Sequence, residues 1–449
     1  MGRHGWLLMG LCGILFSQGA WTNDLLTAYR EAQHRDAVLQ AASAQLAGAE
    51  ELVPQARAAF LPQLLSQGST THERQVYAIG STNLTGTSLS SAAGNVSTFN
   101  ITVGQPMWDL AGLRRLKQAH SQVEQARLVY RNAAQNLILR VAQAYFAIQS
   151  AADQLDTLKS QRQAFQELLR QAQVREQQGL STHTDVAEAE SFFDTTEQPI
   201  IDAENDLEDA KRGLAEITGS YPQSVAPLRE DVPLLRPEPD SAQEWAEGAR
   251  HDNLDVQAAA LGVDVTERDV GVQRAKYWPT LSLQGSVAHT TEPDAFGGNQ
   301  EIEGVGLQLS WPLYQGGTVQ SLVRQSMATL NQAKAQLDIT QRHVERMVSL
   351  AFRSVQTGVA RVQAAKRAVE SGRIAVEASR RGVEFATRTE FDLLNQQNNY
   401  YSAVRIYRQS RYAYLTAVLQ LKQLANRLQE ADLVSVDELL AVGPESQTP

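Results

Sequence analysis

The segment Ala56–Leu64, ARAAFLPQL, recurs with few changes as Gln273–Leu281, QRAKYWPTL, 217 residues further along the chain. The same offset joins further matched positions on either side: His34 with His251, Gln40-Ala41-Ala42 with Gln257-Ala258-Ala259, and Gln67-Gly68-Ser69 with Gln284-Gly285-Ser286. Beyond these positions the offset becomes 206, where Tyr145-Phe146 matches Ala351-Phe352. So many matches in the same order indicate an internal duplication.

Each copy predicts a helix, two strands, a very long helix, a turn and a second helix. Residues 113–178 contain neither Gly nor Pro, and residues 313–443 contain no Pro. Leu137, Val141 and Ile148 recur at spacings that place them on one side of a helix. At about 1.5 Å per residue such helices reach roughly 100 Å, which favours a coiled coil or a helical tube over a compact domain.

The predicted strands alternate apolar and polar residues. Phe99, Ile101 and Val103 alternate with polar neighbours, as do Val305 and Leu307 in the second copy. This alternation is typical of transmembrane β-barrel strands, although the first strand shows it weakly. A soluble amphipathic hairpin is the alternative, but the flanking long helices leave little core for it to pack on. The segments 77–96 and 292–300, rich in Gly, Ser, Thr and Asn, are expected to be loops at the strand tips.

Four strands in one chain cannot close a barrel. The core of a bilayer offers no hydrogen-bond partners, so every backbone polar group there must be paired within the protein. Open sheet edges are therefore excluded. Several copies must therefore supply eight, twelve or sixteen strands, so the sequence predicts an oligomer.

The N-terminus and the net charge restrict the cellular compartments and the partners to be expected. Arg3 and His4 precede the apolar run Trp6–Phe16, the layout of a secretory signal peptide. The only cysteine, Cys12, lies within that run. The net charge of −10 argues against nucleic acid as a partner, because binding phosphate backbones needs clustered basic residues.

The predicted organisation has five parts. These are a signal peptide at 1–20; a first repeat at 21–218, with strands about 61–78 and 96–107, a long helix about 110–178 and a helix at 185–218; a proline-rich linker at 219–239; a second repeat at 240–428, with strands about 279–291 and 302–313, a long helix about 316–385 and a helix at 392–428; and a C-terminal tail at 429–449. Pro199 is expected to kink or split the helix that contains it.

With both repeats in view, the chain resembles the TolC family of trimeric outer-membrane channel-tunnels. The resemblance rests on Trp311-Pro312-Leu313-Tyr314-Gln315-Gly316-Gly317, Phe60-Leu61-Pro62, Trp278-Pro279, Thr387-Arg388-Thr389 before Asp392, and Thr184-Asp185-Val186. It implies a mainly α fold with β: a homotrimer whose twelve-stranded barrel in outer-membrane lipid continues as a helical tunnel into the periplasm. It also implies a passive exit for efflux or type I secretion. A periplasmic adaptor (membrane fusion) protein and an inner-membrane ABC or proton-driven transporter would open it.

The resemblance also implies a gate at the periplasmic tip. Asp392 would belong to a ring of carboxylates at the entrance, and Asn395 stands where the family pattern has a second aspartate. Arg388 would be a latch that bonds Thr184 and Asp185. The family usually has glycine in the second turn, where this chain has Ala386, whereas the first turn keeps Gly179.

A second interpretation of these turns is purely structural. Thr182-x-x-Asp185 and Thr389-x-x-Asp392 each fit a helix capping box, which can coexist with a gate.

Other function classes are less well supported. No catalytic constellation, metal-ligand spacing or cofactor motif stands out, so we expect no enzyme, metal or cofactor. The alternative function is a periplasmic coiled-coil adaptor or scaffold, which explains the helices but not the alternating strands or the duplication. A substrate-specific porin is a third alternative, disfavoured by the long helices.

Overall fold

The computed structural model describes residues 24–79, 88–292, 298–385 and 387–440. The chain divides into two compact units, each built from both repeats. The first unit holds the residues up to 40, 134–245 and those from 348 onward, and the second holds 41–133 and 246–347. The predicted signal peptide with Cys12, Ala386 and the residues after 440 lie outside the described part.

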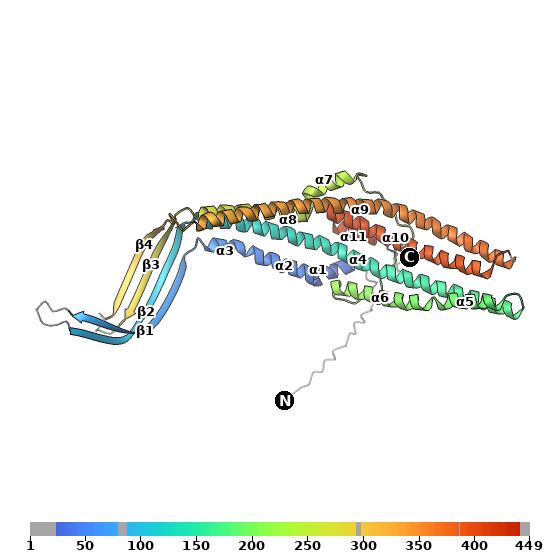
Figure 1. Ribbon diagram of the computed structural model, residues 1–449, viewed down its shortest axis with the longest axis horizontal. Coiled ribbons are helices and arrows are strands. Elements are labelled where there is room, and N and C mark those ends of the chain that lie inside the picture. The colour runs from blue at the N-terminus through green and yellow to red at the C-terminus, as the bar shows by residue number, and fades with distance from the viewer. Residues whose placement is uncertain (1–23, 80–87, 293–297, 386, 441–449) are drawn as a thin grey trace, which may run out of the picture. The chain divides into compact units, whose positions relative to one another are not determined.

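The elements follow the order that the duplication predicts (Figure 1). The first repeat contains α1 (Leu25–Arg35), α2 (Ala37–Glu50), α3 (Leu52–Ala58), β1 (Gln63–Ile79), β2 (Ser88–Trp108), α4 (Leu110–Gln177), α5 (His183–Asp194) and α6 (Glu197–Thr218). The second contains α7 (Ala242–Asp252), α8 (Leu254–Ala275), β3 (Thr280–Thr291), β4 (Gln300–Ser310), α9 (Thr318–Glu384), α10 (Glu390–Leu424) and α11 (Glu430–Asp437).

The four strands form one antiparallel sheet in the second unit, in the order β1-β2-β3-β4. Ile101 lies opposite Val287, and Leu283 lies opposite Leu307. Because successive side chains point to opposite faces, this register gives the sheet one apolar and one polar face. The apolar face carries Phe99, Ile101, Val103, Leu283, Val287, Val305, Leu307 and Leu309, and the polar face carries Asn100, Thr102, Gln284, Ser286 and Gln308. The predicted alternation is confirmed.

The first hairpin is longer than the sequence predicted. Its second strand was expected from about residue 96, but β2 begins at Ser88 and pairs with β1 from Ile79 onward. Within the segment expected to be a loop, only residues 80–87 lie outside the described strands. The reason is that strand pairing joins backbone groups, so a run of small polar residues can continue a ladder without any apolar alternation.

The long helices are present in both repeats. α4 has 68 residues and α9 has 67, so each is roughly 100 Å long. The helix expected at 185–218 is split into α5 and α6. The break falls at Thr195 and Thr196, and Pro199 lies in the first turn of α6, where a proline costs no hydrogen bond. Its counterpart α10 runs for 35 residues without a break.

Hydrogen bonds of two tyrosines, one on α4 and one on α10, hold the linker between the repeats against these helices. The Tyr145 hydroxyl accepts a hydrogen bond from Ala226 N (3.0 Å), and the Tyr414 hydroxyl bonds both the N and the O of Leu235 at 2.9 Å. An isolated antiparallel β-bridge pairs Leu228 with Leu440. Part of the segment assigned to a C-terminal tail is the helix α11, so the order of this region extends further than the sequence indicated.

Candidate functional site

The apolar face of the sheet is exposed in one chain. Val305 is 82% exposed, Leu307 69% and Leu309 65%. Exposed aromatic residues gather where the strands meet the helices of the second unit: Trp108, Tyr277, Trp278, Trp311 and Tyr314. Soluble monomers rarely expose an apolar surface of this kind. An apolar band bordered by aromatic rings suits a bilayer and its interface.

A second site lies at the two helix turns of the first unit, and it is built on two capping boxes. At the first turn, Asp185 N donates to Thr182 Oγ1 (3.2 Å) and Thr182 N donates to Asp185 Oδ2 (2.8 Å). At the second turn, Asp392 N donates to Thr389 Oγ1 (3.1 Å) and Thr389 N donates to Asp392 Oδ2 (3.0 Å). The predicted capping is confirmed, and it fixes where each returning helix begins.

The same hydrogen bonds keep both aspartates charged. The pKa of Asp185 is lowered chiefly by the backbone N–H of Thr182, and that of Asp392 chiefly by the Thr389 hydroxyl. Asp392 is exposed, and one turn later the Asn395 side chain donates to Phe391 O at 3.0 Å. Of the two predicted entrance-ring residues, only Asp392 therefore presents a charge.

Arg388 is bonded within its own hairpin. Its Nη1 donates to Ser379 Oγ at 2.7 Å, and its side chain lies so close to Gly382 that a Cβ there would come within 2.9 Å of it. The hydrogen bonds of the Asp185 carboxylate within the described chain come from Ser181 and Thr182. One chain thus does not join Arg388 to Thr184 or Asp185, and the latch stays a prediction for contacts between copies.

The structure reveals a link that the sequence analysis missed. Arg175 Nη1, near the end of α4, lies 3.2 Å from Glu390 Oε1, at the start of α10. This pair, hereafter the clasp, joins the first hairpin to the second. The Glu390 side chain is 18% exposed and that of Arg175 34%. Burial raises the pKa of Glu390, while Arg175 and a hydrogen bond from Ser181 act in the opposite direction.

Aromatic packing supports the clasp. The rings of Phe165 on α4 and Phe192 on α5 lie 5.5 Å apart edge to face, and Phe391 on α10 lies 6.2 Å from Phe192. Phe165 and Leu394 are almost fully buried in the cluster below them. Both hairpins therefore meet through one apolar core, with the clasp beside it.

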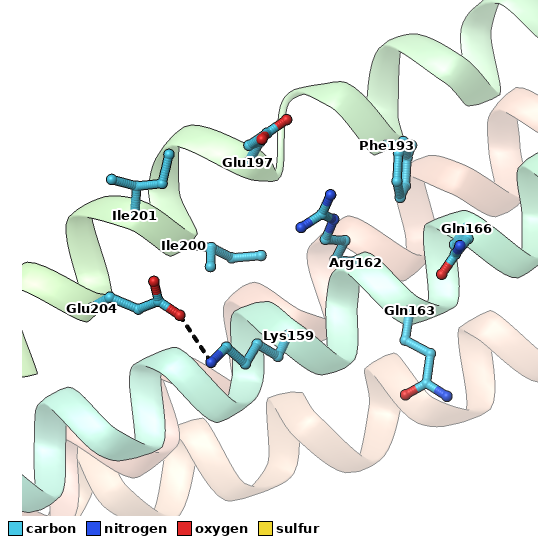
Figure 2. A pocket seen from close by; sticks show the side chains of 9 residues that line it. All are labelled: Lys159, Arg162, Gln163, Gln166, Phe193, Glu197, Ile200, Ile201 and Glu204. Carbon is cyan, nitrogen blue, oxygen red and sulfur yellow. Dashed lines mark ion pairs between the residues drawn. The ribbon is translucent and has the colours of Figure 1, made fainter.

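A groove of the first unit runs between α4 and the α5–α6 pair, with a volume of about 540 Å³ (Figure 2). Lys159 and Glu204 face each other across it at 2.9 Å, and the Arg162 guanidinium lies 5.2 Å from the centre of the Phe193 ring. Ile201 is 52% exposed at its edge. This open, charged groove lacks the enclosed apolar lining of a typical small-molecule site.

Neither a metal-binding cluster nor a membrane-spanning helix is present within the described ranges. Residues 24–79, 88–292, 298–385 and 387–440 hold no group of three or more His, Cys, Asp or Glu placed to bind a metal ion. No helix in this part of the chain is both long and apolar enough to cross a membrane.

The class of protein follows from a family match that covers both repeats. The sequence pattern of the family described as outer membrane efflux protein matches residues 28–220 and 245–427, one stretch in each repeat. The chain belongs to that family, which confirms the resemblance noted in the sequence.

Known relatives agree. The outer membrane protein TolC of Vibrio cholerae is 28% identical over 432 residues, covering 95% of this chain and 96% of TolC. The proteases secretion protein PrtF of Dickeya chrysanthemi is 29% identical over 417 residues, covering 92% and 90%. The crystal structure of the outer membrane protein VceC of Vibrio cholerae shares the fold, with a TM-score of 0.73 at 18% identity, covering 89% and 95%. The predicted fold class, the outer-membrane location and a channel function in efflux or type I secretion are thereby confirmed.

Proposed function

We propose that this channel is the passive exit duct of a type I protein secretion system, held closed at its tip until partner proteins open it. The observation that carries the proposal is the continuity of α4. It begins two residues after β2 and runs unbroken for 68 residues to the turn that bears Asp185 and the clasp. One continuous helix therefore follows the strand that would sit in the membrane and ends beside the residues that would gate the duct.

The cargo is proposed from the relatives. PrtF is named for the secretion of proteases and matches this chain over most of both lengths. Another relative, the outer membrane efflux protein BepC of Brucella suis, is named for efflux, so drug or small-molecule efflux is the second candidate. Among the described residues, the groove between α4 and the α5–α6 pair is open and lined by charged side chains.

The proposed duct is a ring of three copies, the number that the resemblance implies. β1 and β4 are the edge strands of the sheet, each paired on one side only within the described chain. Pairing β4 of one copy with β1 of the next satisfies every edge once the ring closes. Three copies give twelve strands. Energy and opening would come from the partners that the resemblance implies, a periplasmic adaptor and an inner-membrane transporter.

The proposal predicts a nearly closed channel in isolation. Purified oligomer in a planar lipid bilayer is expected to give small, flickering single-channel currents, because the clasps hold the tip shut. Chemical cross-linking of the same preparation should end at a trimer. A folded oligomer that gives no current at all would overturn the duct and favour the scaffold interpretation.

A secretion assay separates the two cargo classes. Cells that lack their own outer-membrane channel but carry a type I transporter and adaptor are expected to release a protease substrate when this chain is expressed. Restored drug resistance without protease release would favour efflux instead.

A further inference from the structure

The apolar face of the sheet becomes polar towards the strand tips. On β2 this face carries Val103, Ile101 and Phe99 in turn, and the next two residues on it are Ser97 and Asn95. Neighbours on one face of a strand are about 6.6 Å apart, since each residue adds about 3.3 Å. The change from apolar to polar side chains on β2 therefore takes place within a single step along the strand.

Hydroxyl groups form a row across three strands at this level. His289 on β3 lies opposite Phe99, and the next row outward holds Thr70 on β1, Ser97 on β2 and Thr291 on β3. Thr70 Oγ1 and Ser97 Oγ lie 3.1 Å apart, and Thr291 Oγ1 lies 3.4 Å from His289 Nε2. The apolar face thus ends in a polar row that begins directly beyond Phe99.

A hollow of about 260 Å³ lies at this boundary. Gly68 on β1 provides the space, because it lies opposite Phe99 and has no side chain; a Cβ added there would come within 3.9 Å of the Phe99 ring. The Phe99 side chain, 52% exposed, forms one wall. Six of the eight lining residues lie on the apolar face, so the hollow opens on that face: Gly68, Thr70, Ser97, Phe99, His289 and Thr291.

The hollow lies at the outer boundary of the membrane. The channel sits in the outer membrane with its helices on the periplasmic side, so the strand tips, which point away from α3 and α8, reach the outer leaflet (Figure 1). Trp108 ends the apolar face at the helix side, about 30 Å along β2 from Phe99. At a strand tilt of about 40°, this length spans roughly 23 Å across the membrane, close to the apolar height of about 25 Å in such barrels. Phe99 therefore lies where the acyl chains of the outer leaflet meet their headgroups.

The lining of the hollow suits a sugar. Its three hydroxyl groups can each donate and accept hydrogen bonds, as the hydroxyls of a sugar do, and the Phe99 ring offers a flat apolar surface to the C–H face of a sugar ring.

The surrounding charges disfavour a phosphate group in the hollow. His289 is the one ionisable side chain among the described lining residues, and it lies opposite Glu301 on β4, whose carboxylate would repel a phosphate. Two basic residues of this face, His72 and Arg74, lie about 7 and 13 Å beyond Thr70 on β1. A phosphate would therefore be drawn outward rather than into the hollow.

We propose that the hollow binds the sugar headgroup of an outer-leaflet glycolipid, whose acyl chains lie along Phe99, Ile101 and Val103. The sugar contacts the hydroxyl row, and the chains cover the apolar residues that one chain leaves exposed. Each copy of the protein holds one such lipid. Because the lipid is bound at both its headgroup and its chains, it fixes the depth of the barrel in the outer leaflet. The inference goes beyond the proposed function, since it concerns the surrounding lipid and is independent of the cargo and of the gate.

Competition between two lipids tests the site. The purified oligomer, freed of its own lipid in detergent, is incubated with equal amounts of monoglucosyl diacylglycerol and phosphatidylethanolamine that carry the same acyl chains. Native mass spectrometry then counts the lipids that stay bound. The glucolipid is expected to be enriched at least threefold and to saturate near one molecule per chain. Equal binding of the two lipids would overturn the proposal, because the acyl chains alone would then be recognised.

Gly68→Val should abolish this preference, because the new side chain fills the hollow, and valine is well suited to a strand. The matched control is Gly285→Val, which lies on the same face but deeper in the apolar band, opposite Val103. Its Cβ would likewise meet only ordinary contacts, the nearest at 3.8 Å on Val305. The control should keep the preference of the wild type. If both variants keep it, or both lose it, the hollow is not the binding site.

A second pair of variants leaves the space unchanged. Thr70→Val combined with Ser97→Ala removes two hydroxyls with little change in volume, and is expected to lower the enrichment of the glucolipid at least twofold. Thr71→Val, which changes the adjacent residue on the polar face, should have no effect. Unchanged enrichment in the double variant would overturn the role of the hydroxyl row. Single-channel currents of the same preparations report on the duct separately, since they do not depend on which lipid is bound.

Discussion

Arg175→Ser is expected to raise the mean single-channel current severalfold at neutral pH. In the closed arrangement, Glu390 is largely buried beside Asp185, and Arg175 is the cation that pairs with it. Without the guanidinium, the carboxylate stays buried near a like charge, and opening the tip would return it to water.

The expected size lies between two limits. Exposed ion pairs contribute about 0–1 kcal/mol, and breaking a fully buried pair costs about 3–5 kcal/mol. A partly buried clasp should fall at about 1–2 kcal/mol per chain. Summed over three chains, roughly 3–6 kcal/mol would shift the balance of closed to open tips at least a hundredfold, since about 1.4 kcal/mol is tenfold.

The matched control is Arg170→Ser. Arg170 lies on the same helix, but its guanidinium pairs with Glu167 one turn away, at 2.7 Å, on an exposed surface. This variant should conduct like the wild type. If Arg175→Ser and Arg170→Ser give the same current, the clasp does not hold the tip closed.

Acidity should act on the same residue. Because burial raises the pKa of Glu390 above its ordinary 4.5 when the tip is closed, the closed form binds a proton more tightly than a solvated open form would. The closed form thus gains stability as the pH falls through the raised pKa towards 4.5, and loses that gain as the pH rises. Wild-type currents are expected to decrease over this range, and Glu390→Gln should remove the decrease. Asp185 and Asp392, whose pKa values are lowered, stay ionised throughout.

Leu307→Arg is expected to remove the protein from the outer membrane. Leu307 is 69% exposed in the isolated chain, so the substitution leaves no cavity in a core. In a bilayer, however, an arginine on the lipid face of a barrel costs about 2–4 kcal/mol near the midplane. In a trimer this free-energy cost would apply to each of the three copies. The amount of membrane-inserted protein should therefore fall at least tenfold in a fractionation assay.

The neighbouring residue supplies the control. Gln308 lies on the polar face of the same strand, opposite Ser282. Gln308→Arg should leave the yield in the outer-membrane fraction within about twofold of the wild type, because that face would line water. Equal loss for both variants would mean that the two faces do not separate lipid from lumen.

Much of this architecture can be predicted from the sequence, because the duplication lets each repeat check the other. The offset predicted both hairpins, the strand faces and the two capping boxes at Thr182 and Thr389. Local chemistry was enough there, since a cap depends on residues three positions apart. Pro199 signalled an interruption, although the break itself falls at Thr195 and Thr196, just ahead of it.

Other features have no local signal. The start of β2 at Ser88 depends on backbone pairing with β1, and its small polar residues show no alternation. The clasp joins residues 215 positions apart, and no local sequence pattern around Arg175 or Glu390 indicates that these two residues pair. Arg388 could be placed at the turn, but its bond to Ser379 follows from how the chain folds back over Gly382.

The clasp also breaks the equivalence of the two repeats. Its counterparts under the repeat offsets are Arg381 and His183, two bases, and each already pairs with a glutamate of its own hairpin, Glu377 and Glu176. Two bases cannot form with each other the ion pair that Arg175 forms with Glu390, so the repeat offsets give each chain one clasp rather than two. Opening that separates the two hairpins of a chain would therefore begin at a single ion pair.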